Sequence, residues 1–376
     1  MKELLKPTFW KVVFVIILCI GIYSTIYRFV NGLGAASAMN DYFPWGLWIG
    51  FDLLCGVGLA AGGFIICATV YVFNIKRFKP IIKPTVLTAF LGYLLVIVAL
   101  LIDLGRPYRI WHAIIMWNPR SVMFEVAWCV MLYTTVLFLE FSPTILERFK
   151  MHKTAKVIKS FTIPIVIVGV ILSTLHQSSL GSLYLIVPEK LHPFWYSPLL
   201  PFFFFISSIG AGLAMVIFES FLSSRAFKKE IEMDLLADLG KVMVVVLALY
   251  LVLKIIDFNF RHVWGYFFMP GHEKYYAFFE LIIGVILPMV MLFFEKVRNS
   301  KKLLFLNALF VLFGFISNRL DVSIIGMEHY SGITYIPSFM EVSITLMIVS
   351  VGFAIFALAV KYLNVFEHDT VRLDKV

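Results

Sequence analysis

The chain has 376 residues, of which 61% are hydrophobic and only 15% are charged, and its mean hydropathy is +0.92. A soluble protein carries about a quarter charged residues, so this composition excludes a soluble protein and predicts an integral membrane protein. The formal net charge of +9 does not indicate nucleic-acid binding, because the basic residues lie mostly in the connections between apolar stretches.

Ten apolar stretches are each long enough to cross ~30 Å of hydrocarbon, which takes about 20 helical residues. In chain order, we expect membrane-spanning helices at 9–30, 44–74, 81–103, 121–142, 157–178, 198–222, 236–258, 275–297, 302–321 and 337–363. The first stretch lacks a small-residue cleavage site, so we interpret it as a retained helix and not as a signal peptide.

The predicted fold class is an all-α polytopic membrane protein with a single membrane domain over residues 1–376. We expect two four-helix bundles, at 44–178 and 198–321, together with flanking helices at 9–30 and 337–363. Within the first bundle, the small residues of "GVGLAAGG" (56–63) would let neighbouring helices approach closely.

The basic residues indicate how the chain is oriented in the membrane. Of the 32 lysines and arginines, 23 fall on one side of the predicted helices and eight on the other. The positive-inside rule assigns the basic side to the cytoplasm, so both termini are predicted to be cytoplasmic. The longer connections at 104–120, 179–197, 259–274 and 322–336 then face outward.

Cysteines and histidines argue against a metal or haem in this chain. The four cysteines lie within predicted spans and form no CxxC pair, which favours packing residues over disulfides or iron–sulfur ligands. A membrane haem of the b type needs paired histidines inside helices, and only His176 of the eight histidines falls within a predicted span. We therefore expect no metal, haem or iron–sulfur cluster here.

Ionisable residues inside the spans are the main functional signal, because such groups are costly in hydrocarbon. We give functional roles to Asp52, Glu125 and Glu219. The other ionisable residues have simpler structural interpretations. Asp103, Asp257 and Glu280 lie near span ends, where water can reach them, and Lys254 can form a local pair with Asp257. Arg319 can form a local salt bridge with Asp321 at the outer end of the ninth span, and Glu341 completes the set of candidate ionisable residues.

Polar and aromatic groups gather toward the predicted outer half of the first bundle. They are Trp45, Trp48, Asp52, Arg106, His112, Arg120, Glu125 and His176. The tryptophans could form only an interfacial belt. A pocket with aromatic walls and a few hydrogen-bonding groups suits a flat, apolar head group with two carbonyls, and a quinone fits that description.

Several motifs, in order, carry a family resemblance. They are "FPWGLWIGFDLLCGVGLAAGGF", "DLGRPYRIWH", "NPRSVMFEVAWC", "LHQSSLGSL" with "LHPFWYSPLLP", and "MVIFESFL". With ten spans, this order resembles the NrfD/polysulfide-reductase family of membrane subunits, and within it the HybB-type subunits of respiratory nickel–iron hydrogenases. The resemblance covers nearly the whole chain from Phe43 to about Tyr362.

The resemblance implies a subunit of the bacterial cytoplasmic (inner) membrane, with its active face toward the periplasm. Such a subunit holds no metal or haem, binds menaquinone or ubiquinone from the quinone pool, and docks a periplasmic ferredoxin-like iron–sulfur subunit. That partner connects to the small and large subunits of a [NiFe]-hydrogenase. By residue-for-residue match, quinone or proton chemistry is expected at Tyr93, Glu125, His176 and Glu219, and the quinone pocket at Trp45, Trp48, Asp52, Arg106 and His112.

These expectations predict charge separation: electrons arrive from outside, while protons pass from Glu219 through Tyr93 or waters to Glu125 and His176.

Two alternative functions stay open. The same scaffold serves polysulfide, nitrite and alternative-complex-III systems. Ten spans with buried carboxylates, and a second glycine run at 207–215, would also fit a secondary transporter, although glycine and proline mark span ends more than centres.

Overall fold

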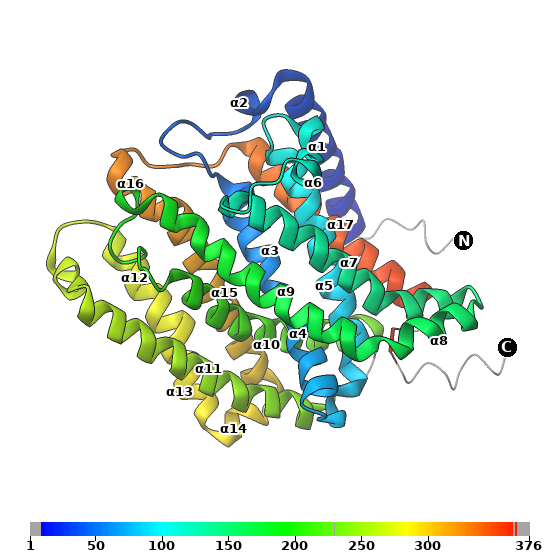
Figure 1. Cartoon of the computed structure of the whole chain (residues 1–376). Coiled ribbons are helices and arrows are strands. Elements are labelled where there is room, and N and C mark those ends of the chain that lie inside the picture. The colour runs from blue at the N-terminus through cyan, green and yellow to red at the C-terminus, as the bar shows by residue number, and fades with distance from the viewer. Residues whose placement is uncertain (1–8, 229, 364, 367–376) are drawn as a thin grey trace.

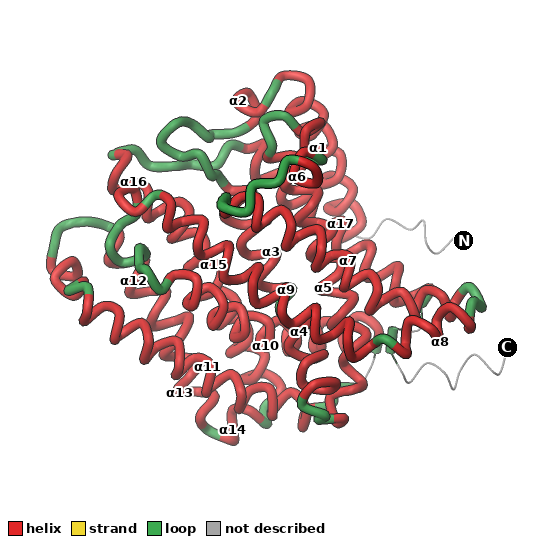
Figure 2. Tube along the Cα trace, in the orientation of Figure 1, coloured by secondary structure: helices red, strands yellow, loops and turns green. Residues whose placement is uncertain are grey.

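The computed structural model describes residues 9–228, 230–363 and 365–366, and within them the chain folds entirely into helices and loops (Figures 1 and 2). Ten helical segments there are long and apolar enough to cross a membrane, as predicted. They are Phe9–Asn31, Trp48–Val72, Lys76–Asp103, Val122–Arg148, Thr162–Ile186, Leu200–Phe227, Met233–Phe260, Glu273–Phe293, Lys301–Ser331 and Phe339–Tyr362.

Six of these spans contain one long α-helix. They are α1 (Phe9–Asn31), α5 (Ile82–Asp103), α7 (Val122–Arg148), α10 (Leu200–Phe227), α11 (Met233–Phe260) and α17 (Phe339–Tyr362). The fifth joins α9 (Thr162–Ser182) to a 3₁₀ turn, η5 (Leu183–Ile186).

The other three spans change helix type within the membrane, and a 3₁₀ turn leads into α5. The second consists of η1 (Trp48–Leu53), α3 (Leu54–Leu59), α4 (Gly62–Cys67) and η2 (Ala68–Val72); the eighth of α12 (Glu273–Leu281), η8 (Ile282–Ile286) and α13 (Leu287–Phe293); the ninth of α15 (Lys301–Leu320), η9 (Asp321–Ile325) and α16 (Gly326–Ser331). The turn before α5 is η3 (Lys76–Ile81).

Short helices occupy the connections at the two ends. They are α2 (Leu33–Ala36), η4 (Pro107–Arg109), α6 (His112–Ile115), η6 (Pro188–Lys190) and η7 (Val263–Phe268) at one end, and α8 (His152–Ser160) and α14 (Glu295–Arg298) at the other. In Figure 1, α2, α6 and α16 lie along the upper side, away from α8 and α14. We keep the predicted sidedness and call the end with α2, α6 and α16 the outer end.

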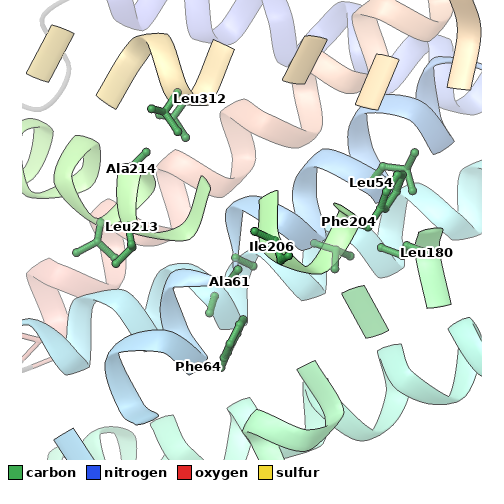
Figure 3. Close-up of a cluster of buried hydrophobic side chains, with 14 of the residues drawn as sticks. Leu54, Ala61, Phe64, Leu180, Phe204, Ile206, Leu213, Ala214 and Leu312 are labelled. Carbon is green, nitrogen blue, oxygen red and sulfur yellow. The ribbon is translucent and has the colours of Figure 1, made fainter. Parts of the chain in front are cut away.

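Helix α10 is the centre of the packing, since it contacts α3, α4, α9, α11 and α15. Figure 3 shows its side chains Phe204, Ile206, Leu213 and Ala214 among residues of α3, α4, α9 and α15. Helix α1 packs at the side against α17, where the Ser24 and Ser343 hydroxyls are hydrogen-bonded at 2.8 Å. Large apolar side chains cover much of the outward surface of the helices, as a lipid environment requires.

A close helix–helix approach joins the two glycine runs. A Cβ built on Gly212 of α10 would lie 2.6 Å from the backbone N of Gly62 at the start of α4. Only hydrogen fits there, so the backbones pack almost directly against each other. By contrast, a Cβ on Gly210 would lie 3.8 Å from its nearest neighbours, which is ordinary van der Waals contact.

Two predicted boundaries differ most from the structure. The span expected at 157–178 combines two helices: the lysine-rich α8 ends at Ser160, and α9 then continues past His176 to Ser182. The polar run therefore lies inside α9, because its hydroxyls bond back to helix carbonyls, Ser179 to His176 O at 3.0 Å and Ser182 to Ser178 O at 3.2 Å. The ninth span likewise continues ten residues beyond 321, to Ser331.

The close approach gives a stability prediction. Gly212→Ala should lower the thermal unfolding midpoint of the detergent-solubilised protein, because the methyl group forces α10 away from α4 at a cost of about 1–3 kcal/mol. Gly210→Ala is the matched control on the same helix and should leave the midpoint unchanged or raise it slightly. Equal midpoints for the two variants, measured by circular dichroism, would contradict the close approach.

Candidate functional site

The centre of the first group of helices, residues 48–186, holds a buried tyrosine–histidine pair. The Tyr93 Oη of α5 and the His176 Nδ1 of α9 are 2.8 Å apart, and both residues are 0% exposed. The other ring nitrogen, His176 Nε2, has no hydrogen-bond partner among the described residues. A buried polar atom without a partner is costly, so this nitrogen marks a position for a ligand or a water.

More unpaired polar atoms surround the pair. Tyr133 of α7 packs edge-on against Tyr93 with ring centroids 4.7 Å apart, and its hydroxyl lies beside Ser173 without standard hydrogen-bond geometry. Gln177 donates to the backbone O of Val57 at 3.0 Å, which leaves its Oε1 unpaired. The first group thus contains a small polar centre in an otherwise apolar interior.

A stripe of polar residues on α7 passes this centre. Glu125, Cys129, Tyr133 and Glu140 are separated by four, four and seven residues, a spacing that places them on one face of a helix. Glu125 is exposed at the outer end, and Cys129 lies beside Ser179 of α9. At the inner end, Glu140 lies beside the thiol of Cys67.

Glu140 is a residue that the sequence interpretation missed. It lies inside the predicted span 121–142, and its fifteen-residue separation from Glu125 equals about four helical turns. A count along the helix face would have placed both carboxyl groups on the side that faces the other helices.

Glu219 lies on the inner half of α10, apart from the tyrosine–histidine pair. Its side chain is buried beside Thr88 of α5, and its Oε2 has no partner of hydrogen-bond geometry. A cavity of about 80 Å³ reaches it from the inner end, and the lining includes Ser220, Glu230 and Glu232. This cavity is large enough for a few waters and has the polar partners that waters need.

A second cavity meets Glu219 from another side. It has a volume of about 510 Å³ and an almost entirely apolar lining from α3, α5, α10 and α17, including Met215, Phe218, Phe353 and Phe356. Glu219 therefore stands between a polar cavity and an apolar one.

The residues predicted to form one quinone pocket are divided among several places. The Asp52 carboxylate accepts a hydrogen bond from Thr345 of α17 at 2.7 Å, and Trp48 packs against the same helix. Trp45 packs edge-on against Tyr184 at the outer end of the fifth span, with centroids 5.1 Å apart. These contacts draw Trp48 and Asp52 toward α17, on another side from His176.

The outer connection between α5 and α7 contributes no direct contact to the pair. Arg106 is exposed and His112 is half-buried. Among the described residues, no hydrogen bond or ion pair joins either of them to His176 or Glu125. Of the nine predicted site residues, the structure brings only Tyr93 and His176 into hydrogen-bond contact.

The second group of helices, residues 200–331, has a buried ionic network that corrects the expected local pairs. Asp257 pairs with Arg261 at 2.6 Å, whereas the Lys254 ammonium donates to the backbone O of Phe194 at 3.3 Å. Arg319 is fully buried inside the ninth span, so its guanidinium bonds residues of α10 and α15 and not Asp321. Its acceptors are Asn318 Oδ1 at 2.6 Å, Ser207 Oγ at 2.8 Å and Phe204 O at 3.1 Å.

Two further carboxylates have structural partners, and one of them, Glu280, was expected near a span end. Glu280 accepts hydrogen bonds from Asn318 at 2.9 Å and Trp195 at 3.1 Å, so it is buried and not in water. Glu341 caps the start of α17, where it accepts the backbone N–H of Ser338 at 2.7 Å.

Comparison with known proteins gives consistent matches along the chain. A family model described as "Polysulphide reductase, NrfD" matches residues 35–328. A protein of Nitratidesulfovibrio vulgaris is 41% identical over 361 residues, which cover 93% of this chain and 92% of that protein. The probable Ni/Fe-hydrogenase 2 b-type cytochrome subunit of Escherichia coli K12 is 32% identical, with 90% and 88% of the two chains covered. The menaquinone reductase integral membrane subunit of N. vulgaris is 27% identical, covering 93% and 89%.

The name of the Escherichia coli relative raises the question of a haem. Among the described histidines, only His176 lies in the interior of a span, and its Nδ1 already bonds Tyr93. His329 lies in the last turn of the ninth span at the outer end, and His368 lies outside the described residues. The described residues therefore do not fit a haem held by two facing histidines.

An absorption spectrum tests this expectation. The purified protein should show no haem bands in the difference between the dithionite-reduced and the air-oxidised state, because the described part of the chain places no pair of histidines in the membrane interior. Stoichiometric haem bands that disappear in His176→Ala would show that His176 is an iron ligand.

Proposed function

This chain belongs to the NrfD, or polysulphide reductase, family of oxidoreductase membrane subunits, and we propose that it exchanges electrons between a periplasmic iron–sulfur subunit and membrane quinone. The proposed complex is a respiratory [NiFe]-hydrogenase, with menaquinone or ubiquinone as the electron acceptor. The names of two relatives, a Ni/Fe-hydrogenase 2 subunit and a menaquinone reductase subunit, support this assignment.

The observation that carries the proposal is the unpaired His176 Nε2 in a fully buried setting. In the tautomer in which the Tyr93 hydroxyl donates to Nδ1, the neutral imidazole carries its proton on Nε2 and offers it to an acceptor. A quinone carbonyl oxygen is such an acceptor. When bound, the quinone takes up two electrons and two protons. The polar atoms around His176 therefore fit a head group with carbonyl oxygens.

The two residues have separate roles in this proposal. His176 orients a carbonyl oxygen through Nε2 and supplies its proton. Tyr93 fixes the tautomer and the direction of the imidazole through Nδ1, and its hydroxyl can return a proton to the ring. The low dielectric around the pair strengthens both interactions, because no bulk water competes for them.

Protons are proposed to reach the centre from the inner side. Glu219 is placed to collect them, because the polar cavity with Glu230 and Glu232 leads to it from the inner end. Glu219 lies beside Thr88, a residue of α5, and the same helix carries Tyr93 five residues farther on. Electrons from outside and protons from inside would separate charge, against ~2.3 kcal/mol per charge for each 100 mV of membrane potential.

Glu140 is a second candidate for the inner proton donor, favoured by its place on the α7 stripe. It lies beside Cys67, inward of Tyr133 on the same helix, and Tyr133 contacts Tyr93 directly. The stripe thus gives a route along α7 to the same tyrosine–histidine pair.

Replacement of His176 tests the quinone assignment. In the complex isolated through a tag on this chain, His176→Ala should lower hydrogen-dependent quinone reduction by about 10²-fold or more, as expected for loss of a general acid. Hydrogen-dependent dye reduction should remain intact, since the dye takes electrons before they reach the membrane. The subunits that accompany the tagged chain also identify the electron donor.

The control is His152→Ala, which removes an exposed histidine of α8 at the inner end. Loss of both activities in His176→Ala would make His176 an assembly residue. Molybdenum or nitrite-reductase partners in the preparation would assign the chain to another NrfD-type complex, and a chain that purifies alone would favour a transporter.

Charge separation is tested in proteoliposomes that contain the complex. Glu219→Gln should reduce the membrane potential formed per hydrogen oxidised, because the amide cannot take up a proton. Glu140→Gln measures the contribution of the α7 route. Its control on α7 is Glu147→Gln, which removes only a surface partner of Lys159. A normal potential in Glu219→Gln would exclude Glu219 from the proton route.

A further inference from the structure

Three connections at the outer end of the second group of helices bring two histidines and a glutamate together. His192 follows η6, Glu273 begins α12, and His329 lies in α16. One possible ligand atom from each residue lies within 4.8 Å of the other two. None of these residues takes part in the proposed quinone or proton chemistry.

Two of the three side chains are held firmly. His192 is 5% exposed, its backbone N–H donates to Gly326 O at 2.8 Å, and its ring packs edge-on against Tyr266. Glu273 is 7% exposed in the first turn of α12. Their positions are therefore set by the surrounding fold before any ligand binds.

The third side chain is free to adjust. The side chain of His329 is 62% exposed, its ring lies 5.0 Å from that of His192, and its Nδ1 is 3.5 Å from Glu273 Oε1. Tetrahedral ligands with bonds of about 2.0–2.1 Å lie about 3.3 Å apart. The exposed His329 ring can rotate to bring its donor nitrogen closer to the other two donors.

A second pair supports the arrangement from the side. His272 Nε2 lies 3.0 Å from Glu328 Oε2, and Glu328 Oε1 accepts the backbone N–H of Tyr335 at 2.9 Å. The two dipeptides thus lie side by side, with His272 facing Glu328 and Glu273 facing His329. Such neighbouring hydrogen bonds hold the backbone beside a metal site in place.

The His192 imidazole makes one hydrogen bond that a bound cation would replace. The Phe194 N–H donates to His192 Nδ1 at 3.2 Å, which is long for such a bond, so metal binding would displace only a weak interaction.

We propose that His192, Glu273 and His329 bind one divalent transition-metal ion of the zinc type at the outer end of the protein. Two imidazole nitrogens and one carboxylate oxygen are ligands that Zn²⁺ accepts in tetrahedral sites, with water in the fourth position. The ion would tie together the connections before α10 and α12 and the end of the ninth span. This proposal is independent of the proposed quinone function and departs from the sequence-based expectation of no metal.

The test uses the full-length protein in detergent, without a histidine tag. After EDTA treatment and gel filtration, the protein is incubated with micromolar ZnSO₄ and desalted, and bound zinc is measured by mass spectrometry. Wild type and His152→Ala, whose histidine is exposed at the inner end, should each retain about one zinc per chain. His192→Ala, Glu273→Gln and His329→Gln should each lose zinc or bind it at least tenfold more weakly.

His329→Gln keeps the test sharp, because its side chain is exposed and its replacement leaves the core intact. A monodisperse His329→Gln protein that retains a full equivalent of zinc would overturn the proposal, and so would a wild type that retains none. Bound Co²⁺ provides a second readout: the visible spectrum of a tetrahedral nitrogen–oxygen site should appear in wild type and be absent from the three ligand variants.

Discussion

The burial of polar side chains between α5, α7 and α9, away from bulk solvent, is the constraint on which the site depends. In that space a polar atom must find a partner within the protein, and the Tyr93–His176 hydrogen bond is the result for two of them. The bond uses one imidazole nitrogen and leaves the other unpaired. The same burial strengthens any hydrogen bond from that nitrogen, since a carbonyl oxygen placed there meets a donor without competition from bulk water.

The remaining fold serves to hold these helices together. Helix α10 runs through the centre, and its contact with α4 at Gly212 lets the two groups of helices share one interior. Because of this contact, Glu219 on α10 lies beside Thr88 on α5, and the inner cavities meet the helix that carries Tyr93. A single close approach therefore connects the proposed proton entry with the proposed quinone centre.

Hydropathy alone predicted the ten spans, because about 20 apolar residues in a row have few other stable arrangements. It failed at His176 and at Arg319, where polar residues continue a helix instead of ending it. The reason is that their partners are helix carbonyls or side chains of other helices, which no local pattern reveals.

Tyr93 and His176 were both singled out by family resemblance, but their contact depends on how α5 and α9 are rotated. Glu140 could have been found by its spacing from Glu125, whereas the cluster of His192, Glu273 and His329 depends on three connections that only the fold brings together.

We propose that His176 holds the quinone head group. An experimental structure of the complex with a bound menaquinone analogue tests it most directly. A carbonyl oxygen of the analogue should lie within hydrogen-bond distance of His176 Nε2, with Tyr93 still bonded to Nδ1. An analogue bound elsewhere, for example with its head group beside Glu219 in the apolar cavity, and with His176 Nε2 paired to protein or water, would contradict it.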